Sequence, residues 1–597
     1  MTVSGTRQAE DLALLRRYEP VLRYTRGELF LPMSVESYLR SCGLWRATGQ
    51  QLRAPGDITA TCLAEAGAAA VADDLSLQFV ERPLTRRELR RWRRESGRTR
   101  FVAGNSRFAT VGLLGRLIDA VMRLSLLLRG RVPGGTTAAA EQRYRSGPQP
   151  DACPYYGHVT HDRGFVALQY WFFYAMNDWR STFGGVNDHE ADWEQVTIFL
   201  ADPPEPDARP AWVAFSSHDE AGDDLRRRQD DPDIDWQGTH PVVYAGGGSH
   251  SGGYLPGDYL VTVEPPALRR LLAGTRRLAR VFLPWTRDRE GTALGIPFID
   301  YRRGDGAGIG PGAERPWNAV LVDDETPWVR DYRGLWGLDT GDPFGGERAP
   351  SGPRYERTGS VRRCWSDPVG WAGLDKETPS PEVERRAVEE RIAELDDLIV
   401  AADAELDTRG DELRRIQAGI RALDSAGTRA DRTALAAPEE AVDQVRVRRL
   451  ALGEEREALA RAAAAGLPPG DPHAHLRHRA VPNVDPVRTR HRVLRVWSTV
   501  SASVLLVGLA LIVVDNRGDV VPALVFLAVL MLCVEAFARG HLLRFVGGLL
   551  AVAGLAAVIW TAAQAAIGNW RWAVAAVLVL SAVVLLLANV RDFFLKR

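Results

Sequence analysis

Residues 187–200, NDHEADWEQVTIFL, decide the fold expected for the largest part of this chain. Successive side chains of an extended strand point to opposite faces. One face of this stretch therefore carries Asp192, Glu194, Val196, Ile198 and Leu200. The other face carries Trp193, Gln195, Thr197 and Phe199. Because the first face begins with two carboxylates and continues as hydrocarbon, the pattern predicts a strand that runs from a polar edge into an apolar core.

The residues at this polar strand end are suited to bind a divalent cation. His189 directly precedes the strand, so its imidazole can approach Asp192 and Glu194. Two hard oxygen ligands and one neutral imidazole are a common cation-binding set. The alternative is that both acids are simply hydrated or paired with arginine. Three further residues are candidate neighbours of this edge: Glu190, His218 and His250.

Short β-rich runs surround the motif, and each leads into polar residues or glycine. They are FVALQYWFFY at 165–174, AWVAF at 211–215 followed by SSHD, and HPVVY at 240–244 followed by AGGGSH. Runs of this length and composition are typical of strands. They predict a mainly β soluble domain over residues 10–375.

The combination of YWFFY, HEADWE, SSHD and HPVVYAGGGSH resembles the bacterial relatives of the fungal vacuolar protein sorting-associated protein sixty-two family, over about residues 14–375. HEADWE at 189–194 is also similar, more distantly, to the G-H-R-H-D-W-E signature of the necrosis-inducing toxin-like family. Both resemblances imply an antiparallel β-sandwich.

The second resemblance also implies a metal site. In the toxin-like family the first histidine, the aspartate and the glutamate of the signature bind a divalent metal together with an upstream aspartate. The corresponding positions are His189, Asp192 and Glu194, with Asp178 or Asp188 as the fourth ligand. Ca²⁺ or Mg²⁺ is favoured, and Zn²⁺ or Mn²⁺ is the alternative if histidines join. Ala191 replaces the second histidine of the signature and Glu190 its arginine, so an activity that needs those side chains is not implied.

Composition excludes some classes of protein. The chain has 597 residues and a formal net charge of −1, so wholesale nucleic-acid binding is not expected. Its five cysteines show no C-x-x-C spacing, which is typical of free thiols in a reducing compartment. The N-terminal residues lack the apolar stretch of a signal peptide, so we expect the soluble part to stay in the cytosol.

A helical insertion is expected near residues 82–130. Residues 82–100 are densely basic, and residues 111–128 are apolar apart from three charges at helical spacing, Arg116, Asp119 and Arg123. Such a helix can lie in the membrane interface with its arginines against anionic lipids, and the basic run from Arg82 to Arg100 can contact the same lipids. Alternatively, it is a core helix with a solvated edge, preceded by an exposed basic helix.

Residues 380–465 predict an antiparallel coiled-coil hairpin. Apolar residues recur at four-three spacing from Ile392 to Leu423, the pattern breaks near residues 425–432, and a second helix is expected from Pro438. The same apolar seam can instead support homo-oligomers. A proline-rich linker is expected over 466–490.

The C-terminal region, residues 491–597, predicts four transmembrane helices at 496–514, 520–537, 542–563 and 572–590. Arginine and lysine are most frequent before the first span, between the second and third, and after the fourth. By the positive-inside rule, both termini and the soluble domains are expected in the cytoplasm of a bacterium, at the plasma membrane.

Three functions agree with this organisation. The first is a membrane-anchored binding module whose metal-bearing edge recognises a lipid head group, a glycan or a protein. The second is a metal-dependent hydrolase with Glu190 or His218 as the base. The third is an oligomeric membrane pore or scaffold.

Overall fold

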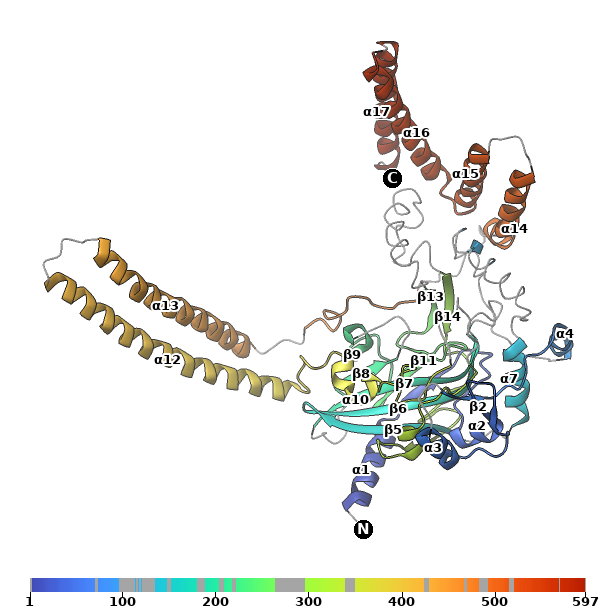
Figure 1. Ribbon diagram of the computed structural model, residues 1–597, viewed down its shortest axis with the longest axis horizontal. Coiled ribbons are helices and arrows are strands. Elements are labelled where there is room, and N and C mark those ends of the chain that lie inside the picture. The colour runs from blue at the N-terminus through green and yellow to red at the C-terminus, as the bar shows by residue number, and fades with distance from the viewer. Residues whose placement is uncertain are drawn as a thin grey trace.

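The computed structural model consists of a β-rich N-terminal region, two long helices and a C-terminal group of apolar helices (Figure 1). The structure describes residues 3–69, 74–95, 113, 116–117, 120, 135–147, 152–179, 188–202, 209–216, 222–263, 296–338, 349–422, 429–465, 470–482, 492–514, 520–568 and 570–595. This order of regions agrees with the sequence prediction of a β domain followed by helical parts.

A six-stranded sheet is the centre of the β-rich region. Its order is β16 (Trp317–Leu321), β5 (Cys153–Asp162), β6 (Phe165–Asn177), β7 (His189–Ala201), β8 (Trp212–Phe215) and β9 (Arg226–Arg228). β6 and β7 are 13 residues each and pair antiparallel from Phe165 opposite Ala201 to Asn177 opposite His189. The motif-bearing strand is therefore an inner strand of the sheet.

A second sheet faces the first across a shared core. It contains β10 (Trp236–Gln237), β11 (His240–Ala245), β1 (Val21–Arg23), β15 (Gly308–Ile309) and β12 (Gly252–Gly253). The inter-sheet cluster combines residues of both sheets, among them Leu22, Val243, Tyr174, Val196, Ile198 and Leu200. The alternation predicted for residues 192–200 thus places the even-numbered hydrocarbons in one core.

The sequence analysis expected antiparallel pairing throughout, but two pairs of strands are parallel. β1 pairs parallel with β11, and β16 pairs parallel with β5. Parallel pairing requires a long crossover between the two strands. The two strands of each pair are far apart in the chain, so the intervening strands and helices form that crossover.

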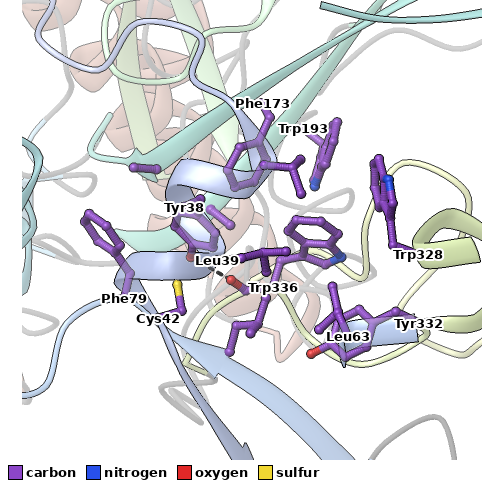
Figure 2. Packing of buried hydrophobic residues seen from close by; sticks show 14 of the residues in the cluster. Tyr38, Leu39, Cys42, Leu63, Phe79, Phe173, Trp193, Trp328, Tyr332 and Trp336 are labelled. Carbon is purple, nitrogen blue, oxygen red and sulfur yellow. Dashed lines mark hydrogen bonds between the residues drawn. The ribbon is translucent and has the colours of Figure 1, made fainter. Parts of the chain in front are cut away.

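The opposite face of β6 and β7 is covered by a tryptophan cluster, which includes Phe173, Trp193, Trp328 and Trp336 (Figure 2). Around it lie the three-stranded sheet β3 (Gln51–Arg53), β2 (Gly43–Arg46) and β4 (Leu75–Gln78), and the helices α2 (Val35–Ser41), α3 (Ala60–Ala69) and α9 (Pro327–Asp331). The Tyr38 hydroxyl donates to the Trp336 carbonyl at 2.6 Å. The segment around Trp328 begins as a short helix, with Pro327 in its first turn.

The remaining elements of this region are short. They are α1 (Val3–Tyr18), α4 (Arg86–Glu95), α7 (Gly135–Ser146), η3 (Gly222–Leu225), β13 (Gly257–Val263), β14 (Ile296–Arg302), α10 (Arg363–Ser366) and α11 (Pro368–Trp371). Residues 130–154 are rich in glycine and proline, a composition typical of a loop. Because Ala138 to Gln142 are good helix formers, α7 forms within that range and packs Ala138 and Ala140 inward.

Two long helices, α12 (Pro381–Ala422) and α13 (Arg429–Ala464), lie side by side (Figure 1). They are antiparallel, with interhelical ion pairs Arg391–Glu455 at 2.9 Å, Asp403–Arg449 at 3.0 Å and Asp396–Arg456 at 3.0 Å. The second helix begins at Arg429, and Pro438 lies inside it rather than at its start. Coiled-coil packing of the seam and self-association remain predictions.

The segment after α13 is not only a linker. Within residues 470–482, His473 Nε2 lies 2.9 Å from Asp231 Oδ1, and the Arg479 guanidinium pairs with Asp233. The backbone N–H groups of Arg477 and His478 donate to Asp224. Because Asp224, Asp231 and Asp233 flank β9, the chain returns to the β-rich region before it continues to the apolar helices.

The C-terminal region contains α14 (Arg492–Val514), α15 (Val520–Ala538), α16 (Leu542–Ala566) and α17 (Trp570–Leu595). Among the residues described, three helical stretches are long and apolar enough to cross a membrane: Val496–Val514, Val520–Ala538 and Leu542–Gln564. In α17, the described apolar stretch is Trp570–Ala582. The expected fourth span and the sidedness of the protein therefore remain predictions.

Candidate functional site

The acidic end of β7 lies beside the end of β6. Asp192 is opposite Tyr174, and Glu194 is opposite Phe172. Tyr174 and Phe172 belong to the inter-sheet cluster, whereas Trp193 belongs to the tryptophan cluster on the other face. Asp192 and Glu194 therefore share one face of the strand, as the alternation predicts.

Ala191 interrupts the regular strand geometry just before Asp192. Its φ is +57°, a left-handed conformation that is rare for a residue with a side chain. One such residue in a strand changes the directions in which the neighbouring side chains point. Glu190 lies next to it and does not share the surroundings of Asp192.

The Glu190 carboxylate joins two distant segments of the chain through hydrogen bonds to their backbone N–H groups. It accepts hydrogen bonds from the backbone N–H groups of Phe79 at 2.9 Å, Val80 at 2.8 Å and Leu338 at 3.1 Å. Burial raises the pKa of Glu190, and the three N–H donors oppose that rise. The residue is 1% exposed, so this placement differs from the expected position at a solvent-reachable edge. Both oxygens are occupied, which disfavours Glu190 as the base of a hydrolase.

His250 provides the counter-charge of two carboxylates. Its Nδ1 lies 2.9 Å from Asp192 Oδ2, and its Nε2 lies 3.7 Å from Glu28 Oε1. The imidazole stacks on the ring of Tyr174 with centroids 3.8 Å apart. Burial lowers the pKa of His250, but the carboxylates of Asp192 and Glu28 outweigh burial and raise it to about 10. His250 is therefore cationic at neutral pH and buried between two acids.

Asp178 follows β6 on the same side of the site. Its backbone N–H donates to the Gly248 carbonyl at 3.1 Å, and its Oδ1 is buried without a hydrogen-bond partner. A Cβ atom at Gly248, where φ is +76°, would lie 2.5 Å from that oxygen. Burial, together with the charges of Glu28 and Asp188, raises the pKa of Asp178 well above its ordinary value. The Asp178 carboxyl group is thus buried close to two other carboxyl groups, those of Glu28 and Asp188.

The other predicted ligands are close in sequence but hold different partners. Ser216 Oγ donates to Glu194 Oε2 at 2.6 Å, and Thr137 Oγ1 donates to Asp188 Oδ2 at 2.7 Å. His189 Nδ1 lies 2.8 Å from the Ala191 carbonyl oxygen. His218 lies outside the described residues.

The loop that carries His250 is buried and well supported. Ser249 Oγ and Ser251 Oγ donate to the two oxygens of Asp300, at 2.8 Å and 3.0 Å. Arg302 Nε donates to the same carboxylate at 2.8 Å. The glycine-rich sequence of residues 246–253 is typical of a flexible turn, but its partners lie on β14, much later in the chain, where no local pattern indicates them.

Glu28 is the site residue that the sequence analysis missed. It accepts hydrogen bonds from the backbone N–H groups of Leu29 and Gly248, at 2.9 Å and 2.7 Å. It lies far before the HEADWE motif, in a stretch with no recognisable ligand spacing. Only the tertiary structure places it near His250.

A second group of candidate metal ligands lies elsewhere. Among the described residues, Asp231, Asp233 and His473 form the group whose ligand atoms all lie within 4.8 Å of one another. Arg479 pairs with Asp233, and Arg227 Nε lies 3.7 Å from Asp231 Oδ2. Because two arginines already balance the two carboxylates, this group has less need of a cation than the site around Asp178.

Comparisons with known proteins give one distant resemblance. No protein-family model matches the chain, and no characterised protein matches it. Similar solved structures include necrosis and ethylene inducing protein 2 from the causal agent of cocoa's witches' broom disease. The sequence identity is 19%, the match covers 17% of this chain and 44% of that chain, and the TM-score is 0.13. Another is NLPPya in complex with mannosamine, where the sequence identity is 17%, the match covers 18% of this chain and 46% of that chain, and the TM-score is 0.14.

These values describe a short and weak similarity. The chain spans less than half of the length of either protein. The resemblance to the necrosis-inducing family therefore remains a prediction from the sequence, and no comparison supports the resemblance to the vacuolar sorting family.

Proposed function

We propose that this protein is a membrane-anchored binding module whose acidic site holds a divalent cation and, through it, a polar ligand at the membrane. The observation that carries the proposal is the buried Asp178 oxygen without a hydrogen-bond partner, beside Glu28 and Gly248. A buried carboxylate oxygen without a donor is costly, and a cation would satisfy it.

The donor set favours a hard cation. Asp178, Asp188, Asp192 and Glu194 offer carboxylate oxygens, and His189 offers an imidazole. Ca²⁺ or Mg²⁺ fits the oxygen-rich set best, with Zn²⁺ or Mn²⁺ as the alternative. When bound, such an ion would supply positive charge to an anionic or hydroxyl-bearing ligand. Loading would require Asp192 to release the His250 imidazole and Glu194 to release the Ser216 hydroxyl.

The ligand classes we propose are a lipid head group, a glycan or a protein at the membrane surface. Four spans with both termini in the cytoplasm would keep the site on the inner face of the plasma membrane. Helix α4 supports contact with anionic lipids, because most of its residues are exposed arginines: Arg86, Arg87, Arg90, Arg91, Arg93 and Arg94.

Metal content of the purified full-length protein tests the proposal. We expect the wild type to retain a divalent ion after dialysis, in an elemental analysis, and D178N and D192N to lose it. D231N is the matched control because it alters the other acidic group. Loss of metal in D231N with retention in D178N would move the ion to the Asp231 group and refute the proposed site.

Ligand binding is the second test. Liposomes of stated head-group composition and an immobilised glycan panel would be probed with Ca²⁺, with Mg²⁺ and with a chelator. The proposal expects binding that disappears with the chelator and in D192N. Binding that is equal with and without metal would contradict it.

A further inference from the structure

The apolar segment 111–128 contacts the C-terminal apolar helices through Arg116. Arg116 is 2% exposed, and its guanidinium donates to Glu535 Oε1 at 2.5 Å and to Ser501 Oγ at 2.6 Å. Glu535 belongs to α15 and Ser501 to α14. A residue of the soluble part of the sequence therefore lies between two candidate membrane spans.

The described residues of the segment share one helical face. Leu113, Arg116, Leu117 and Ala120 are helical, and their spacing of three, one and three residues places them on the same side of a helix. Each is buried or partly buried. This face carries one cation within otherwise apolar residues, which is the pattern expected for contact with a single buried carboxylate.

Glu535 is surrounded by donors. Arg539 Nε donates to Oε1 at 2.7 Å, and Trp497 Nε1 donates to Oε2 at 2.6 Å. Glu535 is 1% exposed and lies close to the end of the stretch Val520–Ala538. An ionised carboxylate at such a position needs internal partners, because lipid supplies none. The partners are Trp497 of α14, Arg539 directly after α15, and Arg116.

We propose that Leu113, Arg116, Leu117 and Ala120 belong to an additional membrane-embedded element that docks on α14 and α15, held there by the Arg116–Glu535 ion pair. The surface formed by Trp497, Ser501 and Glu535 accepts this segment of the same chain. The Arg116–Glu535 ion pair connects the N-terminal part of the chain to the C-terminal apolar helices, although Arg116 lies far before the first span in the sequence. It does not depend on the metal site.

A cleavage experiment on the full chain tests whether the Arg116–Glu535 ion pair holds the two parts together. A protease site is inserted after residue 485, so that cleavage separates residues 1–485 from the tagged C-terminal helices. We expect the wild-type N-terminal fragment to co-purify with the tagged helices in mild detergent. In R116E the co-purified fraction should fall at least about tenfold, because the new carboxylate would be buried against Glu535 and the two like charges would repel each other.

Two further variants keep the result interpretable. The double variant R116E/E535R restores opposite charges and should recover at least part of the co-purification. R91E is the control, since Arg91 forms an exposed pair with Glu95 and should behave as the wild type. The proposal is overturned if the wild-type fragment separates on cleavage, if R116E co-purifies like the wild type, or if R116E/E535R is no better than R116E.

Discussion

Glu190 is the position where a structural and a chemical role can be separated most clearly. Its carboxylate is 1% exposed and holds three backbone N–H groups, from two residues after β4 and one residue near the tryptophan cluster. We predict that E190A destabilises the β-rich region without a specific effect on metal content. The same change would abolish turnover, with the fold intact, if Glu190 were a catalytic base.

The magnitude follows from the hydrogen bonds. Each buried donor left without an acceptor costs about 1–3 kcal/mol, and some of the three will be partly rescued by rearrangement. We therefore expect a loss of roughly 3–6 kcal/mol for E190A. At roughly 2 °C for each kcal/mol in a domain of this size, the thermal midpoint should fall by about 6–12 °C. E190Q keeps one oxygen and should lose roughly 1–3 kcal/mol.

Thermal unfolding of the full-length protein in detergent, followed by tryptophan fluorescence, measures the effect, because Trp193, Trp328 and Trp336 report on the adjacent core (Figure 2). E325Q is the matched control, since the Glu325 side chain is 82% exposed and should shift the midpoint little. An unchanged midpoint in E190A would refute the stabilising role of the Glu190 hydrogen bonds. Equal midpoints for E190Q and E190A would refute the assignment of the loss to individual hydrogen bonds.

Three other substitutions test separate parts of the structure by the same unfolding measurement. G248A should cost roughly 2 kcal/mol and weaken metal binding, because φ is +76° and the new Cβ would meet Asp178 Oδ1 at 2.5 Å; a gain in stability would contradict this packing. W336A should cost roughly 3–5 kcal/mol through the cavity it leaves, and a loss below about 1 kcal/mol would mean that the cluster collapses around it. Burial raises the pKa of Asp223, but the hydrogen bonds from Lys376 and Arg226 outweigh it and lower the pKa to about 2. The ordinary value is 3.8, so the stabilisation by Asp223 is present above that pH and is lost as the pH falls through about 2. D223N should therefore be less stable than the wild type by about 1 kcal/mol or less at pH 7, and the difference should disappear below pH 2.

Local patterns predicted the parts of the site that lie on one strand. Asp192 and Glu194 share a face, and Trp193 points into the opposite core, because a side-chain period of two is a local property of extended backbone. The long helices were predicted for the same reason, since their apolar spacing is contained in each helix. The start of α13 was misplaced because Pro438 is tolerated inside the helix.

The rest of the site depends on contacts between distant segments. Glu28 and His250 come together through the parallel pairing of β1 with β11, which no short sequence pattern encodes. The left-handed conformation of Ala191 turns Glu190 toward Phe79 and Val80, whereas simple alternation would keep it on the face of Asp192. Sequence reasoning therefore found candidate ligands but could not decide which of them already have partners.

The hairpin of α12 and α13 is connected to the β-rich region at both of its ends, which restricts its movement. Helix α12 begins shortly after Asp375, near α11, and the chain that leaves α13 returns to β9 through His473 and Arg479. Both ends of the hairpin are thus held at the same region. Loss of the His473 and Arg479 contacts would free one end and increase the conformational entropy of the hairpin. Hydrogen exchange of the amides in 470–482 should therefore rise in D231N and D233N, whereas exchange in β6 and β7 should not change; equal protection of 470–482 in both variants and the wild type would show that other contacts hold this segment.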